Sequence, residues 1–147
     1  MNIFASSSCP FESAQNLDDK RVVKMVLESA QLLNNALPEH ERFYKPTHIN
    51  HPSSRWTSSN KANYSWLVDH FIALCMEYKK RYNKVHACER FMPNITTHYI
   101  PYDSSSIEFD NCTPYKDMKD VHMAYKLTLN DKWENDKRIP TFYGRRA

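Results

Sequence analysis

Glycine is almost absent from this 147-residue sequence, which contains a single copy, Gly144. Walker loops and dinucleotide-binding fingerprints need several glycines to bring the backbone close to phosphate groups, so the sequence excludes both kinds of site. An all-β fold rich in tight turns also draws heavily on glycine. The shortage therefore argues against glycine-cradled nucleotides and against an all-β fold.

Long apolar runs and paired cysteines are missing as well. No stretch approaches the length of a membrane span, and the first residues, MNIFASSSCPFES, lack the basic region and the apolar core of a signal peptide. The four cysteines (Cys9, Cys75, Cys88 and Cys112) form no C-x-x-C pair, and Cys75 falls on an apolar helical face that favours a buried thiol. We expect a protein of the reducing cytoplasm (the host cytoplasm if it is viral), without membrane association, cofactor or metal.

Charge is unevenly distributed, although the net value is only +3. Residues 42–68 contain four Lys or Arg side chains and no Asp or Glu, whereas residues 93–114 contain three acidic side chains and no Lys or Arg. The chain ends in a segment that mixes basic and aromatic side chains. Segregated basic segments with interleaved aromatics indicate a surface that faces a polyanion, with nucleic acid as the leading candidate and scattered surface lysines as the alternative.

Residues 18–37 have the pattern of an amphipathic helix. Their apolar residues recur at helical spacing, Asp18 or Asp19 is a suitable cap, and Pro38 marks the end. The helical period gathers five polar side chains on the opposite face: Arg21, Lys24, Glu28, Gln31 and Asn35. A carboxylate among cations and amides is either an ordinary solvated face or the centre of a site.

Two further helices are expected, one from Ser58 or Ser59 to the basic cluster that ends at Lys84, and one from Asp117 to Trp133. Residues 38–58, with three prolines, predict a loop, and residues 93–115 predict a second irregular segment. The apolar start of the chain predicts a buried strand or extended anchor, which would bring the α-amino group near the core. The sum is a mostly α, single compact domain, residues 1–147, with three main helices and long ordered loops.

His48 and His51 stand three residues apart in the predicted loop. Such a pair is a weak metal signal, because no third ligand is obvious nearby. Hydrogen bonding to phosphate or to the loop backbone is therefore favoured over a metal site.

Taken in order, these segments resemble the pyrimidine-dimer DNA glycosylase family of the phage endonuclease V type, over most of the chain. Residues 1–4 resemble the short apolar start of the relatives. Residues 17–28 align without a gap on the helix that bears the family's catalytic glutamate, which falls on Glu28. Residues 49–56 (INHPSSRW) resemble a His-Pro…Arg-aromatic segment, and residues 138–145 (RIPTFYGR) resemble a C-terminal aromatic segment that lies against DNA. The resemblance implies an endonuclease V-like fold.

The resemblance also implies base excision from double-stranded DNA: an N-glycosylase that extrudes a damaged or modified base. It gives the amine of Met1 the role of nucleophile and Glu28 the role of catalytic carboxylate. An α-amino group, with a pKa of about 7.7–8.0, is partly unprotonated near neutral pH and can form an imine at C1′ of the sugar. Contacts to phosphate, sugar and bases then fall to nine residues: Arg21, Lys24, His48, His51, Arg55, Phe142, Tyr143, Arg145 and Arg146.

Three positions depart from the family pattern. Asn2 stands where the best-known members expose a threonine after Met removal, and a residue of this size normally leaves Met1 in place. Leu27 and Gln31 stand where the family has arginines. These departures leave the target base and the AP-lyase activity open, and the oligomeric state is open as well. The alternatives are a non-catalytic nucleic-acid-binding module on the same fold, and a metal-dependent hydrolase that uses the two histidines.

Overall fold

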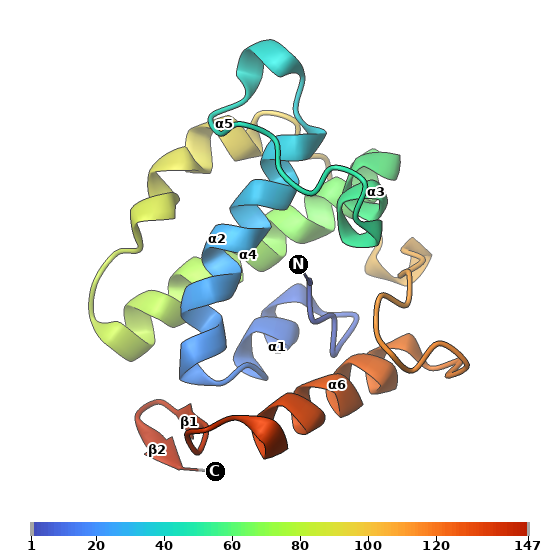
Figure 1. The fold of residues 1–147 in the computed structure, drawn as a ribbon. Helices are drawn as coiled ribbons and strands as arrows, with labels where there is room; N and C mark the ends of the chain where they lie inside the picture. Colours follow the sequence, from blue (N-terminus) through green and yellow to red (C-terminus); the bar gives the residue numbers. More distant parts are fainter. Residues whose placement is uncertain (1, 147) are drawn as a thin grey trace.

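Helices dominate residues 2–146, the part of the chain that the computed structural model describes (Figure 1). The three longest are α2 (Asp19–Ala36), α4 (Lys61–Tyr82) and α6 (Val121–Asn135). The shorter helical elements are α1 (Pro10–Gln15), η1 (Glu39–Glu41), α3 (Pro52–Ser59), η2 (Ala87–Phe91), α5 (Met92–Thr96) and η3 (Ser104–Ser106). The prediction of a mostly α chain is confirmed. In the described part of the chain, no helix is both long and apolar enough to cross a membrane.

The core lies where α2 crosses α4, with α1 packed against α4 from the side of the amino terminus (Figure 1). α2 buries one apolar face, which is the pattern expected from the spacing of its side chains, whereas the first half of α4 is buried on nearly all sides. Large side chains that are fully buried include Trp66, Phe71, Leu32, Leu33 and Leu74. Burial of one such aliphatic or aromatic side chain contributes about 1.5–3 kcal/mol, so the α2–α4 contact is a stable platform for the polar face of α2.

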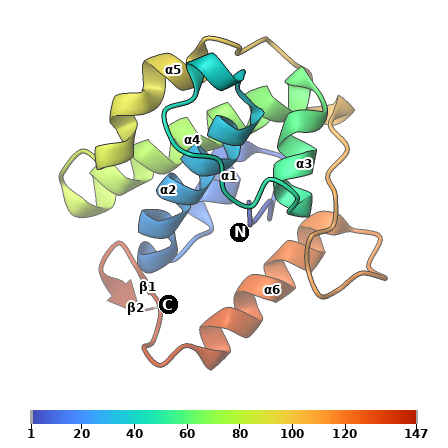
Figure 2. The same cartoon turned by 45° about the horizontal axis from the view of Figure 1, so that its top comes forward.

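The amino-terminal segment, residues 2–9, forms neither a helix nor a strand and enters between α2, α3 and α6 (Figures 1 and 2). Side chains from two helices hold its backbone: the indole N–H of Trp66 donates to the Ser8 carbonyl at 2.9 Å, and Nδ1 of His122 donates to the Ala5 carbonyl at 2.7 Å. Because side chains of both α4 and α6 form hydrogen bonds with this segment, its path is fixed along most of its length.

A buried histidine secures the start of α1. Nδ1 of His70 donates to the Pro10 carbonyl at 2.9 Å, and its ring stacks on Trp66 at a centroid distance of 5.2 Å. Complete burial lowers the pKa of His70 to about 4, so the ring is neutral at pH 7. The neutral ring has one N–H, which the Pro10 carbonyl accepts. The role of His70 is therefore structural.

The prediction of a loop over residues 38–58 is wrong in its last third, because Pro52–Ser59 forms α3. The proline that was interpreted as a helix breaker stands in the first turn, where its missing N–H has no intrahelical partner to lose. Two other boundaries move: α4 begins after Asn60, whose side chain accepts from the Asn63 N–H, and α6 begins after Asp120.

The tail folds into an antiparallel hairpin, β1 (Thr141–Phe142) and β2 (Arg145–Arg146), which the sequence did not predict. Its two turn residues, Tyr143 and Gly144, have φ angles of +55° and +78°. Type I′ hairpin turns require positive φ at both central positions, and only glycine adopts that conformation without strain. The single glycine of the chain is therefore used at the turn that closes the tail.

Candidate active site

Glu28 lies in the middle of α2 and lines a pocket of about 230 Å³. The pocket forms where α2, α6 and the amino-terminal segment meet, and its lining residues are Asn2, Phe4, Arg21, Lys24, Met25, Glu28 and Lys132. Asn2, the residue directly after the one that carries the α-amino group, is part of the wall of this pocket. Met1 itself, the predicted nucleophile, lies outside the described residues.

Burial of Glu28 favours uptake of a proton, although the charges around it oppose this. Burial of the half-buried side chain raises the pKa of Glu28 above its usual value, while positive charge on Lys24, Lys132 and His48 acts in the opposite direction. The burial effect prevails. A carboxylate with a raised pKa exchanges protons nearer to neutral pH than an ordinary glutamate, and such groups are typical of general acid–base sites.

A strained turn leads the chain into this pocket. Phe4 has a φ of +45°, a conformation that bulky residues rarely adopt, and its N–H donates to Oδ1 of Asn2 at 2.8 Å. The carbonyl of Phe4 accepts from the Ser6 N–H at 2.7 Å. Buried Phe4 thus turns the backbone so that Asn2 lines the same pocket as Glu28.

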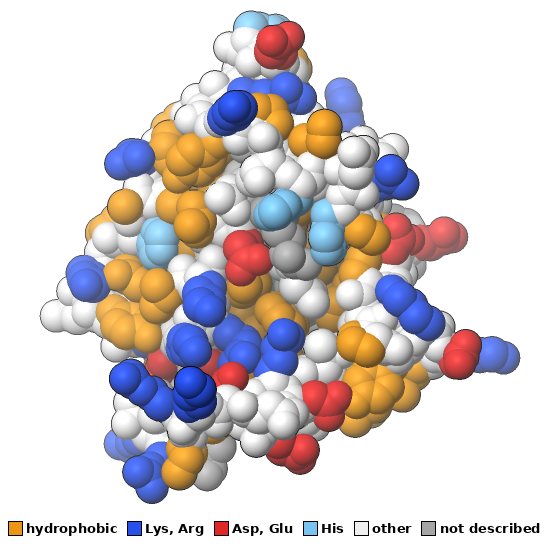
Figure 3. Space-filling model, in the orientation of Figure 1, with side chains coloured by type: hydrophobic (Ala, Val, Ile, Leu, Met, Phe, Trp, Pro, Cys, Tyr) orange, Lys and Arg blue, Asp and Glu red, His pale blue; other side chains and the backbone are white. Residues whose placement is uncertain are grey.

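The predicted phosphate ligands Arg21 and Lys24 differ in their surroundings. The Arg21 guanidinium lies 3.2 Å from Oδ1 of Asp18 and binds both oxygens of Asp136, at 2.9 and 3.3 Å. Lys24 is exposed. On the face shown in Figure 3, Lys and Arg side chains gather between α2 and α6, beside an acidic side chain near the centre. Arg21 is thus tied to two carboxylates, whereas Lys24 is open to solvent.

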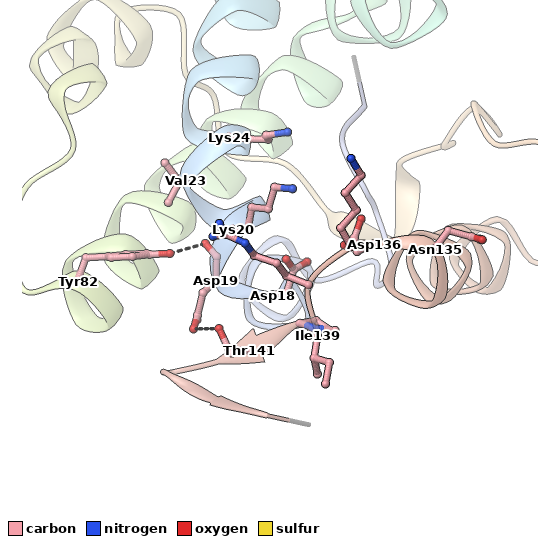
Figure 4. A pocket seen from close by; sticks show the side chains of 13 residues that line it. Asp18, Asp19, Lys20, Val23, Lys24, Tyr82, Asn135, Asp136, Ile139 and Thr141 are labelled. Atoms are coloured by element: carbon pink, nitrogen blue, oxygen red, sulfur yellow. Dashed lines mark hydrogen bonds between the residues drawn. The ribbon is translucent and has the colours of Figure 1, made fainter.

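A larger hollow of about 830 Å³ continues from Lys24 towards the tail (Figure 4). It lies between the first half of α2, the end of α4 and residues 135–141, and Lys24 lines both this hollow and the Glu28 pocket. The hydroxyl of Tyr82 donates to the Asp19 carbonyl at 2.9 Å at its edge. The two hollows therefore lie side by side along α2, with Lys24 in the wall of both.

The loop that carries the two candidate histidines is fixed by buried amides at the end of α2. Asn34 accepts from the backbone N–H of Tyr44 at 3.0 Å, and Asn35 donates to the Thr47 carbonyl at 2.6 Å and to Oγ of Ser54 at 3.1 Å. Asn35 is buried, so it does not belong to the exposed polar stripe on which the helical period had placed it. Its function is to hold the loop against α2.

His48 and His51 lie on the side of Glu28 opposite the tail. His48 is exposed, with a φ of +55°, and His51 caps α3 by accepting the Ser53 N–H on Nδ1 at 3.1 Å. Burial lowers the pKa of His51, and positive charge on His48 adds to the effect, so the ring is neutral at pH 7. With Nδ1 as acceptor, the proton lies on Nε2, which can donate to a ligand. Arg55 is exposed on the following turn of α3.

The tail aromatics lie at the other end of α2 and pack against the rest of the protein, although Tyr143 remains 43% exposed. Phe142 makes an edge contact with Trp133 at 5.5 Å, and the Tyr143 ring covers the Arg81 guanidinium at 4.3 Å. Asp19, which anchors this tail, precedes Glu28 by nine residues, or about 13.5 Å of helix rise. Arg145 and Arg146 are exposed on β2. The structure therefore does not bring the tail residues together with Glu28.

The sequence interpretation missed the contribution of α6. Lys132 lines the Glu28 pocket, and Asp136 binds Arg21. A signal was present: Trp133 ends the helix that the sequence predicts, and Asp136 follows it by three residues, the spacing of neighbours on one helical face. Within residues 2–146, no group of three or more His, Cys, Asp or Glu side chains could hold a metal ion.

Comparison with known protein families shows which family the chain belongs to. The family described as pyrimidine dimer DNA glycosylase matches residues 1–90, which is more than half of the sequence. The chain therefore belongs to the pyrimidine dimer DNA glycosylase family, a family of DNA repair enzymes whose substrate is DNA. The match includes Glu28 and the segment from His48 to Arg55, and it ends before α6 and the tail. No curated protein and no solved structure matches the chain.

Proposed function

We propose that residues 1–147 form a single glycosylase domain that removes a damaged or modified base from double-stranded DNA and then cleaves the strand as an AP lyase. The observation that carries the proposal is the shared pocket of Asn2 and Glu28. It supports a site in which the α-amino group of the chain and a carboxylate act on the same sugar.

In the first step, the lone pair of the Met1 amine attacks C1′ of the extruded nucleotide. The bond between C1′ and the base breaks, and its electron pair leaves with the base, which takes up a proton. Glu28 stabilises the positive charge that develops at C1′ and on the ring oxygen. Loss of the amine proton and opening of the sugar ring then give an imine between the protein and C1′.

In the second step, a proton is removed from C2′, and the 3′ phosphate leaves with the electron pair of its bond to C3′. Glu28 serves as the base, because its raised pKa makes it a better proton acceptor than an ordinary glutamate. Water then hydrolyses the imine and regenerates the free amine. Arg21, Lys24, Arg55 and the tail arginines hold the phosphates, and the N–H on Nε2 of His51 contacts the sugar or a phosphate.

Borohydride trapping tests this mechanism. Incubation of the protein with duplex DNA that contains one abasic site, in the presence of borohydride, should reduce the imine to a stable adduct. Peptide mapping should place the adduct on the first tryptic peptide, and chemical blocking of the α-amino group should abolish it. Glu28→Gln should lower strand cleavage by about 10²–10⁴-fold, the usual contribution of a general acid–base group.

Glu39→Gln is the matched control, because Glu39 is exposed on η1 and the substitution makes the same change of charge. It should leave cleavage and trapping unchanged. If the wild-type protein neither cleaves nor is trapped on abasic DNA, the lyase step is wrong. If it also releases no base while its DNA binding survives Glu28→Gln, the chain is a binding module that has kept the family fold.

A further inference from the structure

The ion pair between Arg21 and Asp136 stands at the boundary between the two hollows. Arg21 lines the Glu28 pocket, and Asp136 lines the larger hollow beside it. Both oxygens of Asp136 bind the guanidinium, at 2.9 Å on Nη1 and 3.3 Å on Nη2. This two-point geometry is the one by which arginine also binds phosphate groups.

The helix that Asp136 ends does not stabilise the negative charge of its side chain. Asp136 is the C-cap residue of α6, where the helix dipole disfavours a negative charge. The groups that stabilise its negative charge line the two hollows. The hydrogen bond from Arg21 and the positive charges of Arg21, Lys20 and Lys132 lower the pKa of Asp136. Lys137, the next residue, lines the same hollow. Asp136, with Asp18 as the second carboxylate on Arg21, therefore sits among cations from two helices.

We propose that Arg21, with Lys20 and Lys132, forms a binding site for a DNA phosphodiester that Asp136 occupies in the DNA-free protein. When DNA binds, a phosphate takes the place of the carboxylate on Arg21, and Asp136 turns out into the larger hollow. Asp136 has the room for this movement, because its side chain is already 22% exposed, against 11% for Arg21. The proposal rests on the proposed function only in taking DNA as the ligand, and it requires no base removal.

The exchange has a distinct salt signature. In the wild type, a phosphate neutralised by Arg21 releases one counterion, but the freed Asp136 takes up a cation in return. Asp136→Asn removes this compensation, so the slope of log K against log salt should become steeper by about 0.9. Affinity for undamaged duplex DNA should rise about fivefold, which is within the contribution of a partly exposed ion pair.

The test is a fluorescence anisotropy titration with undamaged duplex DNA over a series of salt concentrations. Four proteins form a double-mutant cycle: wild type, Asp136→Asn, Arg21→Gln and the double variant. The gain from Asp136→Asn should disappear when Arg21 is replaced. Glu134→Gln is the charge-matched control, because Glu134 is exposed on the same helix, and its effect should not depend on Arg21.

Two results would overturn the proposal: weaker binding with a shallower salt slope in Asp136→Asn, or a gain that persists without Arg21. Either would make Asp136 a residue that only positions Arg21. Asp136→Ser, which also removes the charge, provides the same comparison if the Asn variant folds poorly. An inactive Glu28→Gln protein should still show the exchange, so failure of the catalytic proposal and failure of this one give different results.

Discussion

Asp19 is the residue that holds the C-terminal tail, and its removal should release the tail without unfolding the core. Its carboxylate accepts three hydrogen bonds from the tail, from Oγ1 of Thr141 and from the backbone N–H groups of Tyr143 and Gly144, each at 2.8 Å. It also lies 3.2 Å from Nη1 of Arg81. Asp19→Ala removes all four contacts and adds no bulk.

The size of the effect follows from these contacts. A hydrogen bond to a charged group contributes about 1.5–3 kcal/mol, so the two backbone bonds alone, at the lower value, stabilise tail docking by about 3 kcal/mol. This corresponds to about a hundredfold in the docking equilibrium. The free energy of global unfolding should fall by less, about 1 kcal/mol, because the tail can detach locally while α2 and α4 stay packed. Arg81 keeps Glu77 and the Leu17 carbonyl as partners.

Limited trypsin digestion measures the local opening, and urea denaturation measures the global stability. Cleavage after Arg138 should accelerate about a hundredfold in Asp19→Ala under conditions where opening is faster than cleavage. Asp117→Ala, at an exposed position, is the matched control and should digest like the wild type at this bond. Equal cleavage rates for Asp19→Ala and wild type would show that the tail is held by other contacts, and would refute the reasoning.

Acid should have the same effect as the substitution. Burial raises the pKa of Asp19, but the hydrogen bonds from Gly144, Thr141 and Tyr143 and the charge of Arg81 outweigh it and lower the pKa below its usual 3.8. A depressed pKa means that the stabilisation is complete above about 3.8 and is lost as the pH falls through the lower, folded value. Tail release at neutral pH in the wild type would contradict this direction.

Two further predictions concern the centre of α2. Because the pKa of Glu28 is raised, its contribution to folding is most favourable below pH 4.5 and is lost as the pH rises through the raised value. Glu28→Gln should therefore be at least as stable as wild type at pH 7 in urea denaturation, and this advantage should vanish at low pH. A marked loss of stability at pH 7 would contradict it. Leu27 is 39% exposed and stands where the resemblance expects an arginine, so Leu27→Arg should change the unfolding free energy by less than about 0.5 kcal/mol. It should steepen the slope of log K for DNA binding against log salt by about 0.9. An unchanged slope would place Leu27 away from the phosphates.

The parts of the molecule that sequence predicted are those with local physical causes. The helix of Glu28 was predicted nearly to the residue, because Asp18 caps it and its apolar stripe repeats at helical spacing. Burial of the start of the chain followed from its short apolar run, although the segment forms no strand and turns at Phe4. In α3, by contrast, proline was interpreted as a breaker, although its position in the first turn is one where it favours a helix.

The missed parts of the site depend on contacts between residues distant in sequence. Trp133 donates to Asp18 and Asp136 binds Arg21, in each case across 115 residues, and no local pattern encodes such a pairing. The hairpin was missed because two-residue strands are too short to show alternation. Glu28 could be singled out from the sequence, but Lys132 and Asp136 could be assigned to its surroundings only from the packing of α6.

One rigid helix carries the anchor of the tail, the arginine clamp and the candidate catalytic carboxylate, at Asp19, Arg21 and Glu28. The nine residues from the first to the last fix about 13.5 Å between them, the axial rise of about four base pairs of B-form DNA. A duplex laid parallel to α2 would therefore span about four base pairs between Glu28 and the anchor of the tail. Because one helix carries all three residues, their spacing along its axis does not depend on the loops around it.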